Sequence, residues 1–287
     1  MAARGERLRF RRWLESSTPL DWALRLSLLD LLLQPIGEWF LRPIFLGAAA
    51  AGLLVPGLLR RSGLWLLLAG LAGLRVALDW PLADNHAYLL AYWFLAAGLA
   101  LRSDAPESAL AWNARWMIGL VFALATLWKL TLSPDYLDGT FFRVSLLLDP
   151  RFEALTRALS GLDAATLEGY RHALSAHVDG FGAPGVSVPA LPAALDSFAR
   201  IATAATGAIE AAVAIAFLWP LGRGPSRARD ALLLGFAATT YAVATVEGFA
   251  WLLLAMGIAQ CESDRHRTRL AYLGVYALVL VYRELPW

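Results

Sequence analysis

The sequence predicts an all-α, polytopic integral membrane protein, a bundle of about eight spanning helices. Three observations support this fold class. First, 59% of the 287 residues are hydrophobic and the mean hydropathy is +0.55, whereas soluble domains are closer to half apolar. Second, the apolar residues gather into runs near the roughly 20 residues that a bilayer-crossing helix needs. Third, the arginines cluster between these runs, as they do in the loops of membrane proteins.

We expect a single membrane domain over residues 1–287, with spans at residues 19–34, 43–59, 63–80, 86–102, 114–133, 199–220, 231–258 and 269–285. The first span is the weakest, because Asp21, Arg25 and Asp30 interrupt it. The seventh is long and carries Glu247 near its middle, so it is either one tilted helix or two half-helices. The predicted number of spans is therefore eight, or nine if the seventh run crosses twice.

The distribution of arginine predicts a multi-pass protein of the inner (cell) membrane with a cytoplasmic N-terminus. Residues 1–18 form a basic tail, and the polar residues that follow do not resemble a cleavable signal. With this tail inside, the arginines near 60, 102–115 and 223–229 all fall in cytoplasmic loops. Those at 265–269 fall outside unless the seventh run crosses twice, so the side of the C-terminus stays open.

One long stretch, residues 134–198, is predicted to lie outside the membrane. Part of it should form an amphipathic helix, because apolar residues recur there at helical spacing: Leu167, Tyr170, Leu174 and Val178. Asp163 is a suitable N-cap for that helix. The stretch is expected either to lie on the membrane surface or to cover the bundle as a lid.

Several function classes are disfavoured. A formal charge of +2 is too small to indicate nucleic-acid binding, so the expected partner is the lipid bilayer. The single cysteine, Cys261, excludes an internal disulfide and disfavours a thiolate metal site. His172 and His177 are five residues apart and do not share a helical face, so no metal is expected. The motifs that bind nucleotides or catalytic zinc are also absent.

Lys129 is the first candidate for chemistry. It is the single lysine among 25 basic residues, and it lies inside the apolar run of the fifth predicted span. Burial in such a run favours the neutral amine, which can act as a base. The alternative is a structural lysine near a helix end, whose ammonium group reaches the lipid headgroups.

His86 is the second candidate, with Asn85 beside it at the start of the fourth predicted span. Consecutive antiparallel helices would bring His86 to the same membrane face as Lys129. Arg75 and Asp79 are four residues apart near that face, and they are expected to form an ion pair. Each of these residues also has an ordinary structural interpretation as an interfacial or ion-paired group.

Glu210 lies deep in the sixth predicted span and Glu247 in the seventh. An isolated carboxylate is costly in hydrocarbon, so both should be neutral or paired with another group. Hydrogen bonding between helices is the structural interpretation of both. The functional interpretation is that Glu210 and Glu247 carry a solute through the bundle.

The segment from Asn85-His86-Ala-Tyr-Leu through Arg115-Trp-Met-Ile-Gly-Leu-Val-Phe to Trp128-Lys129-Leu and Pro-Asp-Tyr-Leu-Asp-Gly139 resembles a known family. It is similar to the membrane domain of vitamin K-dependent γ-carboxylase and its bacterial relatives, the HTTM family. The resemblance extends over about residues 20–260, although its specific part is residues 84–139. Glu210 also resembles the acidic residue of a later helix in that family.

The resemblance implies a chemistry that the residues alone do not. Lys129 would deprotonate a reduced quinone of the vitamin K or menaquinone type, with His86 assisting it. Asn85, Arg75, Asp79 and Glu210 would support that site. The oxygenated quinone base would then remove a γ-proton from a glutamate of a membrane or secreted peptide partner, and carbon dioxide would add, a lyase-type reaction.

The sequence departs from that family in two ways. It lacks the large lumenal domain that binds the peptide substrate, and the residues after Phe236 do not include the histidine expected there. Three functions are therefore weighed. The leading one is a carboxylase-like membrane enzyme acting on a quinol or another lipid-soluble substrate. The alternatives are a non-catalytic membrane helper or scaffold, and a small-solute transporter that uses Glu210 and Glu247.

Overall fold

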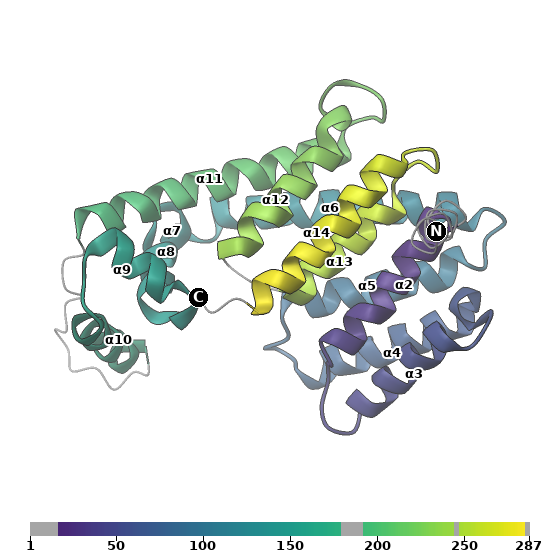
Figure 1. Ribbon diagram of the computed structural model, residues 1–287, viewed down its shortest axis with the longest axis horizontal. Helices are drawn as coiled ribbons and strands as arrows, with labels where there is room; N and C mark the ends of the chain where they lie inside the picture. The colour runs from purple at the N-terminus through teal and green to yellow at the C-terminus, as the bar shows by residue number, and fades with distance from the viewer. Residues whose placement is uncertain (1–16, 179–191, 244–246, 285–287) are drawn as a thin grey trace, which may run out of the picture. The chain divides into compact units, whose positions relative to one another are not determined.

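The computed structural model describes residues 17–178, 192–243 and 247–284 (Figure 1). The all-α prediction is confirmed over these ranges, which contain helices and no strand. The α-helices are α2 (Pro19–Leu33), α3 (Arg42–Leu54), α4 (Ser62–Leu78), α5 (Asn85–Ala100), α6 (Pro106–Thr131), α7 (Pro134–Leu137), α8 (Thr140–Leu148), α9 (Glu153–Ser160), α10 (Ala164–Val178), α11 (Ala193–Leu218), α12 (Arg229–Val243), α13 (Glu247–Ala259) and α14 (His266–Glu284).

The chain divides into two compact units. Unit 1 comprises residues 1–120 and 216–283, and unit 2 is built mainly from residues 121–215. The predicted basic tail, residues 1–18, lies almost entirely outside the described residues. The expectation of one membrane domain over residues 1–287 stays a prediction.

Unit 1 is a helical bundle with an apolar interior. In it α2 packs against α13 and α3, and α4 packs along α5 (Figure 1). The helix α2 starts with a capping box, in which the Thr18 hydroxyl accepts a hydrogen bond from the Asp21 backbone N–H and the Asp21 carboxylate accepts one from Thr18. Large aromatic and aliphatic side chains are fully buried at the centre, among them Leu24, Leu28, Phe45, Trp65, Trp93, Phe94 and Trp251.

Each predicted span coincides with at least one helix, but most of these helices are short. Among the described residues, only α6 and α11, with 26 residues each, are long and apolar enough to cross a membrane, which is weak evidence for membrane association. The 15 residues of α2 extend about 23 Å, less than the roughly 30 Å of a hydrocarbon core. The seventh predicted span contains two helices, α12 and α13, and the residues between them, 244–246, lie outside the description.

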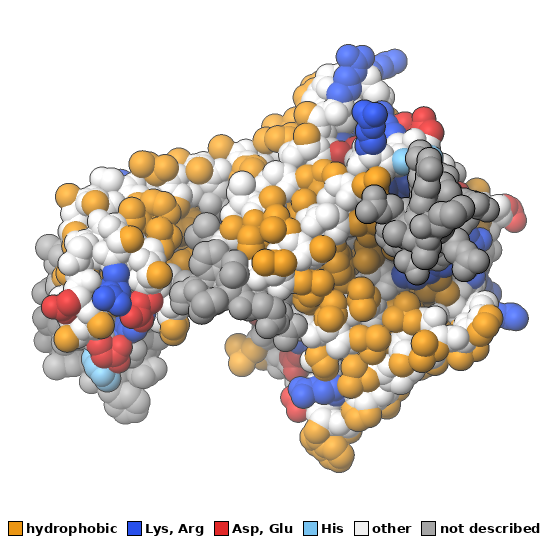
Figure 2. All heavy atoms as spheres, viewed as in Figure 1, with side chains coloured by type: hydrophobic (Ala, Val, Ile, Leu, Met, Phe, Trp, Pro, Cys, Tyr) orange, Lys and Arg blue, Asp and Glu red, His pale blue; other side chains and the backbone are white. Residues whose placement is uncertain are grey.

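Large apolar side chains are common on the surface. Figure 2 shows hydrophobic side chains over the outward faces of the helices, with blue basic groups near the helix ends. Exposed members on the two longest helices include Leu120, Leu124, Leu127, Trp128, Ile201 and Ile215. Single exposed apolar residues are ordinary in soluble proteins, whereas contiguous apolar faces mark contact with lipid or with a partner.

Unit 2 contains the predicted extramembrane stretch, which is more helical than the sequence indicated. The expected amphipathic helix is present as α10, and the Asp163 carboxylate accepts a hydrogen bond from the Thr166 backbone N–H at 2.7 Å. This capping bond holds the pKa of Asp163 below its ordinary value. Leu167 and Leu174 are buried, as their spacing predicted, whereas the side chain of Val178 lies outside the description.

A glycine in unit 1 provides a test of this packing. A Cβ atom added at Gly257 of α13 would lie 2.8 Å from Cζ of Tyr272, a fully buried ring whose hydroxyl is also hydrogen-bonded. We expect Gly257→Ala to lower the free energy of unfolding by about 2 kcal/mol, because the ring cannot move away. Thermal unfolding of the detergent-solubilised protein measures this loss.

Gly274→Ala is the matched control, because Gly274 lies on α14, the helix of Tyr272, and has no atom within 4 Å of its added Cβ. This change should be neutral, or stabilising by up to about 1 kcal/mol, because alanine is the better helix former. Equal unfolding temperatures for the two variants would contradict the packing of α13 against α14.

Candidate functional site

Lys129 lies in the last turn of α6, where the apolar helix meets the short helices of unit 2. Its ammonium group faces Glu210 of α11, 81 residues later in the chain. The Lys129 Nζ atom is 2.5 Å from Oε1 and 2.6 Å from Oε2 of that carboxylate. The side chains are 23% and 9% exposed, respectively, so the two groups form a largely buried ion pair.

A tyrosine completes the surroundings of the lysine. The Lys129 Nζ atom lies 4.6 Å from the ring centroid of Tyr136 in α7, a cation–π distance. Burial and the negative charge of Glu210 raise the pKa of Tyr136 to about 12, although the Thr206 hydroxyl opposes the shift. The buried Tyr136 hydroxyl has no hydrogen-bond partner of normal geometry among the described residues. It is therefore a neutral donor available to another molecule.

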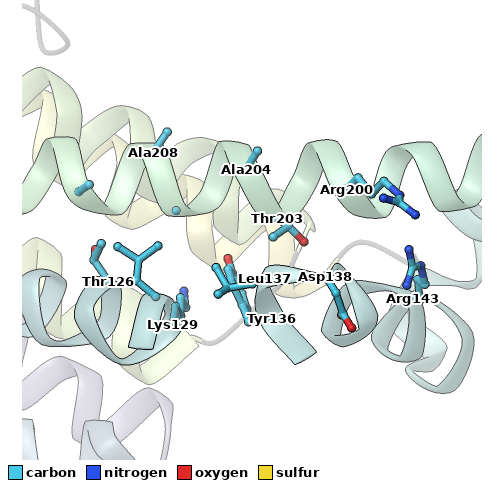
Figure 3. A pocket seen from close by; sticks show the side chains of 13 residues that line it. Thr126, Lys129, Tyr136, Leu137, Asp138, Arg143, Arg200, Thr203, Ala204 and Ala208 are labelled. Atoms are coloured by element: carbon cyan, nitrogen blue, oxygen red, sulfur yellow. The ribbon is translucent and has the colours of Figure 1, made fainter. Parts of the chain in front are cut away.

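Lys129 and Tyr136 line a cavity of about 600 Å³ within unit 2, whereas Glu210 lies behind Lys129 and is not part of its wall (Figure 3). This volume lies within the usual range for small-molecule pockets, about 300–1,000 Å³. One wall is the face of α11 that carries small residues: Ala204, Gly207, Ala208 and Ala211. Leu130 and Leu137 form apolar surface opposite that wall, so the cavity combines apolar walls with a few polar groups.

Two arginines lie at the other end of the cavity, where Figure 3 shows Arg143 opposite Arg200. Both donate to the carboxylate of Asp196, at 2.6 and 3.0 Å. Asp138 also lines this end. Hydrogen bonds from the Thr140 side chain and backbone N–H hold the pKa of Asp138 below its ordinary value, so this carboxylate stays charged. Gly139 follows in a left-handed conformation, with φ of +85°, and allows the turn into α8.

The contact between Lys129 and Glu210 determines which group can accept a proton. The Lys129 ammonium donates to both oxygens of the Glu210 carboxylate, and an ammonium has no free lone pair. The group that can accept a proton in this structure is therefore the pair, through the carboxylate of Glu210, rather than a free amine. The sequence identified both residues, and the family resemblance placed Glu210 in support of the Lys129 site, but an ion pair between the two was not predicted.

The remaining predicted residues lie in unit 1. His86 is in the first turn of α5, 38% exposed, with Nε2 at 3.4 Å from Asp84 and its ring near Phe249. Asn85 beside it is exposed. The predicted ion pair between Arg75 and Asp79 is confirmed, with 3.4 Å between Nε and Oδ2. None of these four residues lines the Lys129 cavity, and the partnership of His86 with Lys129 stays a prediction.

Sequence reasoning missed Tyr136, Arg143 and Arg200. Tyr136 lies inside the motif that carries the family resemblance, and a buried aromatic residue next to a span end was a usable signal. Arg143 carried none, because charged residues outside the spans usually face water. Arg200 carried none either, because it stands at the start of the sixth predicted span, where an arginine side chain commonly reaches the lipid headgroups. The side chain of Glu247 lies outside the description.

Comparisons with known proteins do not identify the chain. No family model matches it, and neither the curated proteins nor the solved structures include a significant match. The resemblance to the HTTM family therefore stays an expectation from the residues quoted above. Among the described residues, no group of three His, Cys, Asp or Glu side chains lies close enough together to hold a metal ion.

Proposed function

We propose that the chain is a multi-pass membrane enzyme that binds a quinol or another lipid-soluble molecule in the Lys129 cavity and removes a proton from it. The observation that carries the proposal is a pocket with apolar walls that is lined by Lys129, the ammonium of a buried ion pair, and by Tyr136, whose hydroxyl has no hydrogen-bond partner of normal geometry among the described residues. Pockets with few, convergent polar groups are the usual sites of small-molecule chemistry.

The proposed topology is that of the sequence prediction, with eight or nine crossings and a cytoplasmic N-terminus. Arginine clusters in alternate loops and apolar residues exposed on the helix faces support it. The short helices, such as α3 with 13 residues, would require a locally thin bilayer or contact with the longer helices.

In the proposed reaction, the hydroxyl of a bound quinol lies next to the pair and the Tyr136 hydroxyl donates to a substrate oxygen. The quinol proton passes to the Glu210 carboxylate, which leaves Lys129 as an unpaired ammonium beside the new quinol oxyanion. The positive charge then stabilises the anion, because the surroundings are largely dry. Proton transfer of this kind by a positioned group contributes about 10²–10⁴-fold to a rate.

The test is binding and turnover of reduced menaquinone or reduced vitamin K by the purified protein. We expect Lys129→Met to lower oxygen-dependent consumption of the quinol at least about a hundredfold, because both the pair and the stabilising charge are lost. His172→Gln is the control, since His172 is 82% exposed and lies outside the cavity. Unchanged turnover in Lys129→Met would rule out the proposed role of the pair.

The direct contact between Lys129 and Glu210 favours a second function, that of a non-catalytic helper or scaffold. The Lys129 ammonium donates to both carboxylate oxygens of Glu210, as expected for a structural lysine. The two functions differ in ligand binding. A scaffold predicts that neither quinol binds with measurable affinity and that Lys129→Met changes only stability.

A further inference from the structure

Unit 1 contains a second cavity, of about 370 Å³, at the ends of several helices. The first turns of α2 and α6 contribute Pro19 and Glu107 to its wall, and the end of α13 contributes Ala259. The exposed partial positive charge at a helix N-terminus favours anions nearby. Two arginines, Arg115 and Arg229, also line it.

Neither arginine forms an ion pair with a carboxylate of the part of the chain that the structure describes. Arg229 is only 4% exposed, and its Nε donates to Gln260 Oε1 at 2.6 Å while Nη1 donates to the Ser226 carbonyl at 3.2 Å. Arg115 donates to the carbonyls of Phe217 and Trp219, where α11 ends. Among the described residues, no ion pair involves either guanidinium. Arg229 is buried, and a buried arginine is normally paired with an anion, so its guanidinium lacks a counter-charge within the described residues. The half-buried Arg115 adds a second positive charge beside the same cavity.

The acidic groups nearby do not supply that charge. Asp230 is buried, but its carboxylate is occupied by Gln260 Nε2 and the Tyr272 hydroxyl. Glu262 lines the cavity and is paired with Arg265 at 3.0 Å. Glu107 also lines it, is exposed to solvent and acts electrostatically on Arg60.

The remaining wall suits a molecule with an apolar part. Leu20, Ala111 and Leu221 line the cavity, and Trp112 contributes a ring that is 60% exposed. Tryptophan is enriched at the level of the lipid headgroups, where its ring is half in apolar surroundings and half in water. The cavity therefore places two arginines beside an apolar surface at a helix end.

We propose that this cavity binds a net-anionic phosphate group, held by the guanidinium forks of Arg115 and Arg229. Arginine matches phosphate oxygens through parallel N–H donors, which a compact ammonium cannot reproduce. The phosphate belongs to an anionic phospholipid or to a free phosphate ester, and both carry the same group. The site is separate from the Lys129 cavity and does not depend on the proposed enzymatic function.

The experiment titrates the delipidated full-length chain in detergent micelles and follows tryptophan fluorescence, because Trp112 is part of the wall. The probes are phosphatidylglycerol, phosphatidylcholine and glycerol 3-phosphate. We expect saturable binding of phosphatidylglycerol, with affinity at least about tenfold above that for zwitterionic phosphatidylcholine. Competition by glycerol 3-phosphate would assign the site to a free phosphate ester, and lack of competition would assign it to a lipid.

Three variants complete the test. Arg229→Gln should weaken binding about tenfold or more. Arg227 is exposed, lies just before α12 and does not line the cavity, so Arg227→Gln should bind like the wild type. Ala111→Leu leaves both arginines in place and fills the cavity, so it tests the site even if Arg229→Gln fails to fold. Equal binding of the two lipids, or equal losses in Arg229→Gln and Arg227→Gln, would overturn the proposal, as would unchanged binding in Ala111→Leu.

Discussion

Replacing Glu210 with alanine is expected to lower the free energy of unfolding by about 3 kcal/mol. The change removes the carboxylate and leaves the Lys129 ammonium, 23% exposed, without its partner. Breaking a buried pair from one side costs roughly 3–5 kcal/mol, and the partial exposure of the lysine places the loss at the lower end. Equilibrium unfolding in mixed micelles measures it.

The double variant Lys129→Met with Glu210→Leu distinguishes the pair from simple packing. Both charges are then replaced by apolar groups of similar size, so its stability should be close to that of the wild type. Glu262→Ala is a surface control, because its ion pair with Arg265 is solvent-exposed and should contribute little. If Glu210→Ala and the double variant lose the same stability, the pair does not have the proposed energetic role.

The second large effect is expected at Asp230, the carboxylate at the centre of a buried network in unit 1. It accepts hydrogen bonds from Gln260 Nε2 at 2.5 Å and from the Tyr272 hydroxyl at 2.9 Å. Asp230→Ala leaves both donors buried without an acceptor. Hydrogen bonds to charged groups contribute about 1.5–3 kcal/mol each, so we expect a loss of about 3 kcal/mol or more in the free energy of unfolding.

Two conservative variants test the origin of that loss. Asp230→Asn retains an acceptor oxygen at nearly the same place and should lose less than Asp230→Ala. Tyr272→Phe removes one donor and keeps the ring, so its effect should also be smaller than that of Asp230→Ala. Should Asp230→Asn unfold as easily as Asp230→Ala, the negative charge rather than the hydrogen bonds would be the source of the stability.

The helices were largely predictable because their signals are local. Apolar runs located the helices, and the Asp163 N-cap correctly placed the start of α10. The helix α6 begins at Pro106, before the span predicted at residues 114–133, because its first turns are polar and a hydropathy pattern does not detect polar helical turns. The short helices α7, α8 and α9 were missed because four to nine residues carry too little periodicity.

By itself, the sequence determined the all-α fold class, the positions of the apolar helices and the identity of the two unusual ionisable residues, Lys129 and Glu210. Each of these follows from neighbouring residues, since burying a charge in an apolar run is costly wherever the chain then goes. Only the tertiary structure decided that the two form a pair, and that Tyr136, Arg143 and Arg200 line one cavity with Lys129. The same holds for Arg115 and Arg229, which are more than a hundred residues apart and meet at one cavity. Such contacts depend on how distant helices pack, which no local pattern of residues encodes.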